Sequence, residues 1–242
     1  MNNKKIYNEQ CWEKFKGLWL GSLYKKQLEI TDDTEKFIWE QFNIFFSAAQ
    51  VIENIPCYNI DGTRVKKENL DSSLIFRQIS GGTLRLILES FFRIMYLICA
   101  PSEEKAKRLN EIISSFGFVY NKFIKEANKN INIYGALIKN LPSEITNLST
   151  QQPNIRDLLK KTKDINGNNM EHLYVMYSIA CLYAHGTVNN SVWDKLFNSN
   201  PRPHAPSLNA FNLIYILSFH YNNIAWKLWK EKYREEFSQY IK

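Results

Sequence analysis

Three charged side chains recur every four residues within a long apolar stretch of the sequence. Arg85, Glu89 and Arg93 lie between residues that are almost all apolar. On a helix this spacing places them along one side, and an arginine buried there requires a carboxylate or carbonyl oxygens as partners. Glu89 can be that partner. The group is either an ion pair that locks helices in register or a site where an arginine faces an anion such as a phosphate.

A second polar stripe lies about 90 residues further along the chain. Steps of four, three and four residues align Tyr174, Ser178, Cys181 and His185, and Tyr177 lies beside them. His185 stands at the expected end of its helix, where it has either a structural role, as a cation stabilised by the helix dipole, or a role in moving protons. If the two helices pack together, an arginine can offset developing negative charge while His185 transfers a proton, which suits phosphodiester cleavage.

These two segments carry a resemblance to a known superfamily. The segment Thr83–Glu89, with its Arg-x-x-x-Glu pattern, and the segment Tyr177–Gly186, which ends in His-Gly, resemble a group of all-helical bacterial proteins and, with them, the HEPN superfamily of helical bundles. Many HEPN proteins are ribonucleases of toxin-antitoxin, CRISPR and antiviral systems, and they commonly form homodimers. The resemblance implies a metal-independent ribonuclease or RNA-binding protein with a protein antitoxin or a second copy as partner. From the superfamily's catalytic residues the resemblance carries over only His185, and the predicted catalytic set joins it with Arg85, Glu89 and Tyr177 from the two polar stripes.

The sequence departs from the HEPN pattern in one respect. HEPN nucleases carry an arginine, four to six other residues and then the histidine on one helix, whereas the residues before His185 are Ser178, Ile179, Ala180 and Cys181 at seven to four positions upstream. Arg85 or Arg93 from the other helix would then contact the phosphate. The alternative is a non-catalytic adaptor or scaffold whose polar cluster only fixes helix packing and whose aromatic surface binds a protein partner.

The distribution of charge indicates a second way of contacting RNA. The formal net charge is +7, and residues 122–163 hold eight Lys and Arg against three Asp and Glu. Such a stretch attracts polyanions, and we expect Arg93, Lys160, Lys161 and Lys163 to contact nucleic acid. The alternative is that these side chains lie on solvated helix faces.

No motif indicates a metal or a cofactor. The pair Glu171-His172 lacks the second histidine of an H-E-x-x-H zinc site, and Gly81-Gly82 belongs to no Gly-rich phosphate loop. The four cysteines are too far apart for a C-x-x-C pair: they are Cys11, Cys57, Cys99 and Cys181. We expect no cofactor, no bound metal and buried free thiols.

Composition and periodicity predict the elements that position these residues. With 9 Gly and 7 Pro, the chain has too few turn residues for an all-β fold or a Gly-rich α/β fold. We expect an all-α bundle of about seven helices, with little or no β structure, as a single domain over residues 1–242. The predicted helices cover about 8–29, 33–55, 72–100, 102–129, 170–186 and 207–240, with short helices between 130 and 168 and near 191–197.

Other details of the pattern predict how these elements pack. Gly81-Gly82 inside the long central helix marks either a break or a close helix crossing. A polar loop is expected near 56–71, with a tight turn at Asp61-Gly62, and an irregular basic region near 130–168. One helical stripe should be core: Trp12, Phe15, Leu18, Trp19, Leu23 and Tyr24.

The sequence also indicates where in the cell the protein is located. No apolar run reaches the ~18 residues that a membrane span requires, and the polar N-terminus does not lead into the apolar core of a signal peptide. We therefore expect a soluble, cytoplasmic protein with no membrane partner.

Overall fold

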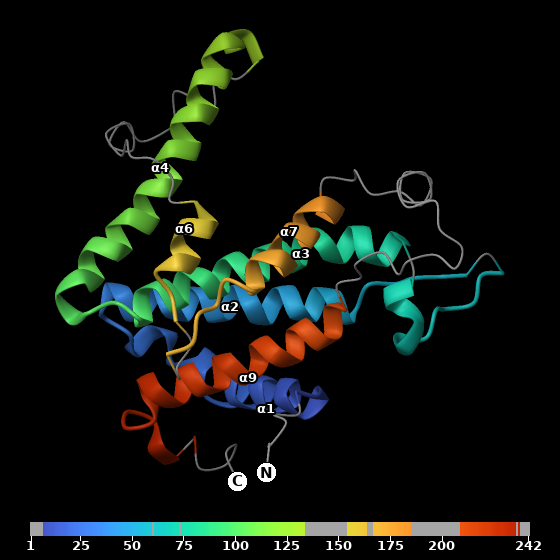
Figure 1. Ribbon diagram of the computed structural model, residues 1–242, viewed down its shortest axis with the longest axis horizontal. Helices are drawn as coiled ribbons and strands as arrows, with labels where there is room; N and C mark the ends of the chain where they lie inside the picture. Colours follow the sequence, from blue (N-terminus) through green and yellow to red (C-terminus); the bar gives the residue numbers. More distant parts are fainter. Residues whose placement is uncertain are drawn as a thin grey trace. The chain divides into compact units, whose positions relative to one another are not determined.

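The computed structural model describes residues 7–59, 61–72, 74–133, 154–163, 167–184, 209–235 and 237. Within these residues the elements are helical, and β structure is limited to two isolated bridges. The all-α prediction is therefore confirmed (Figure 1). The elements are α1 (Glu9–Gly21), η1 (Leu23–Glu29), α2 (Asp33–Glu53), η2 (Lys67–Ser72), α3 (Leu74–Ile98), η3 (Ser102–Glu104), α4 (Lys105–Lys129), α6 (Ile155–Lys160), α7 (Leu173–Ala184) and α9 (Ala210–Trp229), where η denotes a 3-10 helix.

The chain divides into two compact units. The first comprises Met1–Phe91 and His172–Lys242, and the second comprises Phe92–Glu171. The first unit contains α1, α2, most of α3, α7 and α9, and α1 and α9 lie side by side in it (Figure 1). The second contains α4 and α6.

Aromatic rings from α1, α2 and α9 form the core of the first unit. Tyr221 of α9 stacks on Phe45 of α2 with ring centroids 4.2 Å apart, and it meets Phe42 edge-on at 4.7 Å. Phe15 of α1 meets Phe45 edge-on at 5.0 Å. Stacked and edge-to-face pairs of this kind add about 0.5–1.5 kcal/mol each beyond the area they bury.

A buried serine connects α3 to this core. Ser90 Oγ donates to the Gln41 carbonyl at 3.0 Å and lies 3.3 Å from the Tyr221 hydroxyl. Because the Ser90 proton is used on Gln41, Tyr221 is the donor of the second bond. Full burial raises the pKa of Tyr221, so the phenol stays protonated and keeps donating. The three helices α2, α3 and α9 are thus joined by one polar chain inside an apolar core.

The first predicted helix is shorter than expected. The pattern predicted one helix over about 8–29, but α1 ends at Gly21 and the chain continues as the 3-10 helix η1. Ser22 leaves helical geometry at φ −133° and ψ −71° while its N–H still bonds to the Leu18 carbonyl. The change of direction explains why Tyr24 is 53% exposed although the rest of the predicted stripe is buried.

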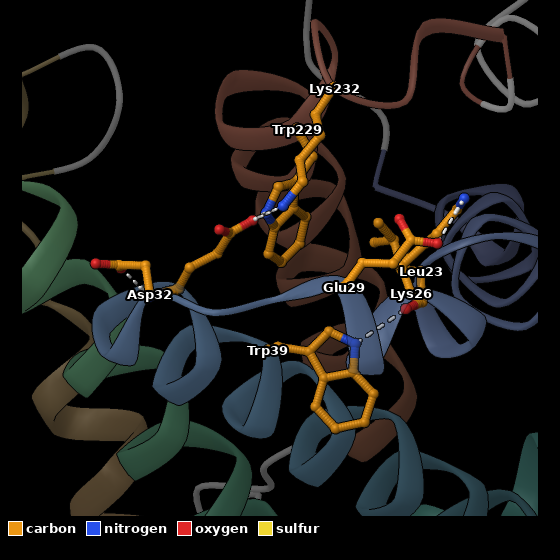
Figure 2. A network of polar contacts seen from close by, with 8 residues as sticks. Leu23, Lys26, Glu29, Asp32, Trp39, Trp229 and Lys232 are labelled. Carbon is orange, nitrogen blue, oxygen red and sulfur yellow. Dashed lines mark hydrogen bonds and ion pairs between the residues drawn. The ribbon is translucent and has the colours of Figure 1, made fainter.

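Polar contacts hold the start of α2 against its surroundings (Figure 2). Asp32 caps α2 by accepting from the Glu35 N–H at 2.7 Å. The Glu35 carboxylate in turn accepts from the Trp229 indole at 2.6 Å and from Lys232 at 3.3 Å. These bonds fix the C-terminal end of α9 to the N-terminal end of α2, and N-caps of this kind stabilise by about 1 kcal/mol.

The helix α3 runs without interruption through Gly81-Gly82, so the pair marks a helix crossing and not a break. A Cβ atom built on Gly81 would lie 2.5 Å from the Tyr183 Cβ and 3.2 Å from the Ala180 carbonyl oxygen of α7. Only a residue without a side chain fits at that distance. At Gly82 the same construction meets nothing closer than 3.9 Å. Of the two glycines, Gly81 is therefore the one at which α3 and α7 are in tight contact.

The predicted polar loop contains the expected tight turn. Asn59 and Val65 donate backbone bonds across it, to Thr63 and Cys57, and Gly62 has φ 80°. That value lies in the left-handed region, which glycine adopts without strain. The C-terminal part of the predicted loop, from Lys67, is the 3-10 helix η2.

In the second unit, Tyr96 contacts a carboxylate and a guanidinium from α4. The Tyr96 hydroxyl donates to Glu111 of α4 at 2.6 Å, and the Arg108 guanidinium lies 4.6 Å from the Tyr96 ring centroid. Burial and the bond to Glu111 raise the pKa of Tyr96 to about 12.

A second contact in this unit joins the end of α3 to the segment after α6. Cys99 donates its thiol proton to the Lys163 carbonyl at 2.9 Å.

Two further predictions differ from the structure. The last helix was expected to reach about residue 240, but α9 ends at Trp229 and Lys230 begins a turn. The four cysteines are free, as expected, but Cys57 is buried whereas Cys11, Cys99 and Cys181 are partly exposed. Among the helices in the described part of the chain, none is both long and apolar enough to span a membrane.

Candidate functional site at the α3–α7 crossing

The helices α3 and α7 bring together residues that are about 90 positions apart in the sequence. Both helices belong to the first unit up to Phe91, and their crossing at Gly81 fixes which side chains meet. Arg85 and Glu89 come from α3, one and two turns after the crossing, and Tyr177 comes from α7. These are three of the four residues that the sequence predicted as catalytic.

One carboxylate oxygen is the centre of the cluster. Glu89 Oε1 accepts from Arg85 Nε at 2.9 Å and from the Tyr177 hydroxyl at 3.0 Å. The Arg85 guanidinium also lies 6.0 Å from the centroid of the Tyr177 ring. Glu89 is the more buried partner, with 17% of its side chain exposed against 38% for Arg85. The arginine is therefore held by its inner edge while its outer part reaches solvent.

The electrostatics keep Arg85 charged and Tyr177 protonated at neutral pH. The bond to Glu89 raises the pKa of Arg85, so the guanidinium remains a cation. Burial, followed by the negative charge of Glu89, raises the pKa of the Tyr177 hydroxyl above its ordinary value near 10. A hydrogen bond with Cys181 acts in the same direction. Tyr177 is therefore a proton donor and cannot act as a base near pH 7.

Aromatic side chains and a serine extend the cluster along α7. The rings of Tyr174 and Tyr177 lie 6.0 Å apart with an interplanar angle of 34°, and both residues are half-buried. Ser178 donates to the Tyr174 carbonyl at 2.9 Å, within its own helix. Ser178 thus bonds to the backbone of its own helix, whereas the Tyr177 ring lies beside Arg85 and the Tyr174 ring lies beside Tyr177.

A second arginine lies on the other side of the crossing. Arg77 is four residues before Gly81 on α3, and its Nη1 donates to the Tyr183 hydroxyl at 3.3 Å. Its guanidinium lies 5.7 Å from the Tyr183 ring centroid, and its Nε is buried without a hydrogen-bond partner. The sequence argument missed Arg77 because it followed the four-residue spacing forward from Arg85. The same spacing continued backward through Gly81 reaches Arg77.

Of the remaining predicted site residues, four belong to the second unit and one lies outside the described residues. His185 lies outside the described residues, so its predicted role stays a prediction. Arg93 is half-buried on α3 and belongs to the second unit. Lys160, Lys161 and Lys163 are exposed in the same unit. Lys160 bonds to Asp157 at 3.4 Å, and Lys161 lies 6.0 Å from the Tyr96 ring centroid.

A separate groove lies away from the α3–α7 crossing, between α1 and α9. It has a volume of about 440 Å³ and contains none of the predicted residues. Its lining residues are Cys11, Lys14, Leu18, Phe219, Asn222, Asn223 and Trp226. In the portion of the chain that is described, no group of three or more His, Cys, Asp or Glu side chains is arranged to hold a metal ion.

Comparisons with family models, with curated proteins and with solved structures found no match to this chain.

Proposed function

We propose that this protein is a HEPN-like helical protein of a bacterial defence or toxin-antitoxin system, that it acts in the cytoplasm, and that it binds and cleaves single-stranded RNA without a metal. RNA is the partner that this proposal requires. A protein antitoxin and a second copy of the chain are the further partners that the HEPN resemblance implies.

The observation that carries the proposal is the way Arg85 is held. Its guanidinium bonds to Glu89 through Nε, and 38% of the side chain is exposed. A guanidinium fixed in this way can offer its outer nitrogens to a phosphate as a two-pronged donor. Because Glu89 and Tyr177 orient it before any ligand arrives, little conformational entropy is lost on binding.

The two tyrosines beside Arg85 favour single strands over duplexes. Sequence-tolerant binding of single-stranded RNA combines cationic groups, which contact phosphates, with aromatic rings, on which unpaired bases stack. Tyr174 and Tyr177 are neighbouring half-buried rings next to a cation, which matches that combination. Base stacking of this kind contributes about 1–3 kcal/mol per base.

The proposed chemistry divides between two residues. His185 would accept the proton of the ribose 2′-hydroxyl as that oxygen attacks the adjacent phosphorus. The bond from phosphorus to the 5′-oxygen breaks, the departing 5′-oxygen takes a proton from water, and a 2′,3′-cyclic phosphate remains. Arg85 would offset the negative charge that develops on the phosphate oxygens. Tyr177 and Glu89 would position Arg85. Since the raised pKa of Tyr177 keeps its proton in place, proton transfer at neutral pH falls to the histidine.

The test uses purified full-length protein, a labelled single-stranded RNA and a buffer containing EDTA. We expect wild-type protein to bind and cleave the RNA, His185→Ala to bind without cleaving, and Arg85→Gln to bind at least tenfold more weakly. Lys227→Gln is the matched control, because Lys227 is an exposed cation on α9 of the same unit. Equal cleavage by wild type and His185→Ala would remove the catalytic assignment. Equal affinity of wild type and Arg85→Gln would remove the RNA site.

One observation favours a second candidate function, a helical adaptor without catalysis. Glu89 Oε1 bridges α3 and α7 through Arg85 and Tyr177, which is also what a device for fixing helix packing would do. In that case Arg85→Gln and His185→Ala would change only the free energy of unfolding, and no RNA would bind at low salt. Stability and RNA affinity measured on the same variants therefore separate the two functions.

A further inference from the structure

Arg77 is a charged side chain of the first unit for which no carboxylate partner is seen among the described residues. Its Nε is buried and makes no hydrogen bond, and among the described residues its guanidinium contacts one polar group, the neutral hydroxyl of Tyr183. The residue as a whole is half-buried, so part of it remains accessible. A desolvated cation is costly unless an anion or several acceptors accompany it.

The two helices of the crossing supply no carboxylate for Arg77. The sequence of α7 contains no Asp or Glu, and α3 contains one acidic residue, Glu89. Glu89 already bonds to Arg85 at 2.9 Å and lies twelve residues after Arg77. At 1.5 Å per residue that separation corresponds to about 18 Å along the helix. Glu89 is therefore too far away to pair with Arg77.

The helix crossing gives this cation a rigid setting. Because Gly81 has no side chain, α7 comes close enough for the Tyr183 ring to pack against the Arg77 guanidinium at 5.7 Å. The ring covers one side of the guanidinium, and the Tyr183 hydroxyl fixes Nη1 at 3.3 Å. An arginine restrained by an aromatic ring, with donor groups unused, has the features of an anion-binding residue.

We propose that Arg77, restrained by Tyr183, binds a phosphate group, and that Arg77 and Arg85 hold two phosphates of one RNA strand on either side of Gly81. The step of eight positions from Arg77 to Arg85 corresponds to about 12 Å along α3, so the two sites take different phosphates. The part of this inference that concerns RNA rests on the proposed function. The phosphate site itself does not, because inorganic phosphate carries the same chemistry.

The first arm of the test measures thermal unfolding with millimolar inorganic phosphate, with ionic strength kept constant by chloride. A ligand that binds only the folded state raises the melting temperature. We expect phosphate to raise it by a few degrees in wild-type protein and by clearly less in Arg77→Gln, where only the Arg85 site remains. The control Lys227→Gln should respond as wild type. A wild-type protein that does not respond, or an Arg77→Gln variant that responds fully, would overturn the inference.

The second arm measures the affinity for a single-stranded RNA as a function of salt. Each phosphate contact on a single strand contributes about 0.7 to the slope of log K against log salt concentration. Arg77→Gln should therefore lower the slope by about 0.7, and the double variant with Arg85→Gln by about 1.4. If Arg77→Gln does not fold, Arg77→Met, which is close in volume and uncharged, replaces it in both arms.

The two arms keep the two proposals distinguishable. Phosphate binding through Arg77 without any RNA binding would leave the anion site in place and refute the proposed function. RNA binding that depends on Arg85, with no change in Arg77→Gln and no phosphate effect, would support the proposed function and refute the inference about Arg77.

Discussion

Glu89 couples two helices through a single oxygen atom. Arg85 and Tyr177 both donate to its Oε1, so the carboxylate position determines where the guanidinium points and how the phenol is held. Hydrogen bonds to a charged group are stronger than those between neutral groups, and the loss of a donor leaves a half-buried charge less well satisfied. The effects of changes at these residues should therefore not be additive.

This coupling predicts the outcome of a change at Tyr177. Tyr177→Phe keeps the ring and removes the donor to Glu89, so we expect the free energy of unfolding to fall by about 1–2 kcal/mol. In a double-mutant cycle with Glu89→Gln, measured by urea denaturation, the two effects should deviate from additivity by about 0.5 kcal/mol or more. Tyr58→Phe, at a residue that is 63% exposed, should leave stability unchanged. Additive effects in the cycle would contradict the geometry.

Tyr96 predicts how stability depends on alkaline pH. Its pKa in the folded protein is raised to about 12 by burial and by Glu111, whereas an unfolded chain has a tyrosine pKa near 10. A group whose folded pKa lies above its unfolded pKa stabilises fully below pH 10, and this stabilisation is lost as the pH rises from 10 to about 12.

The measurement compares wild type with Tyr96→Phe, because Tyr177 and Tyr221 also have raised pKa values and remain in both proteins. The free energy of unfolding should fall more steeply between pH 10 and 12 in wild type than in the variant. Absorbance at 295 nm should show one fewer late-titrating phenol in the variant. Identical pH profiles would show that Tyr96 is not held as described.

At the level of elements, the approach of α3 to α7 depends on one glycine. Two adjacent glycines stand in α3, and only Gly81 faces a neighbour too close for a Cβ atom. Intrinsic helix propensity favours alanine over glycine equally at both positions. The two positions therefore separate the effect of propensity from the effect of packing.

We expect alanine to destabilise the protein at position 81 and to stabilise it at position 82. Gly81→Ala would place a Cβ 2.5 Å from the Tyr183 Cβ and force the helices apart, so we expect a loss of about 1–3 kcal/mol in the free energy of unfolding. Gly82→Ala meets only ordinary contacts and should stabilise by up to about 1 kcal/mol. Chemical denaturation of both variants is the measurement. If Gly81→Ala were as stable as Gly82→Ala, this result would contradict the close contact between α3 and α7 at Gly81.

The ends of α1 and α9 differ from the sequence prediction for a common reason. Apolar residues continue at helical spacing beyond both ends, because the chain that follows also packs against the core. After α1 the chain turns at Ser22, and Leu23 is buried with its carbonyl accepting from the Trp39 indole at 2.9 Å. After α9 Tyr233 and Phe237 are buried. Periodicity identifies residues that face the core, whichever backbone conformation carries them.

For the whole molecule, the excess of positive charge predicts strong salt dependence of RNA binding. Lys160, Lys161 and Lys163 are exposed, and a triple change to glutamine removes three cations from the second unit. If all three contact phosphates, the slope of log K against log salt concentration should fall by about 2. Filter binding of a labelled single strand at several salt concentrations provides the measurement.

The control removes the same charge from the first unit. Lys25, Lys36 and Lys227 are exposed, and their triple change to glutamine lowers the net charge equally. A slope that falls by the same amount in both triple variants would mean that net charge alone, and no defined surface, accounts for the binding. A slope that falls only in the control would contradict the predicted role of the basic region.

The sequence by itself determined the fold class and the approximate positions of the long helices, and it identified Glu89 as a partner for an arginine four residues away, either Arg85 or Arg93. All of these depend on residues that are neighbours along the chain: apolar spacing, turn residues and the four-residue step of a helix. The meeting of Arg85 and Glu89 with Tyr177 was conditional in the sequence, since it required two helices to pack.

Only the tertiary structure shows that α3 and α7 pack together and that Arg77 lies beside their crossing. Which faces of α3 and α7 meet is set by the space left at Gly81, and the fit of two surfaces is not encoded in the periodicity of either one. That no carboxylate among the described residues pairs with Arg77 likewise depends on tertiary packing, because a charge is balanced by what folding brings within a few ångströms of it.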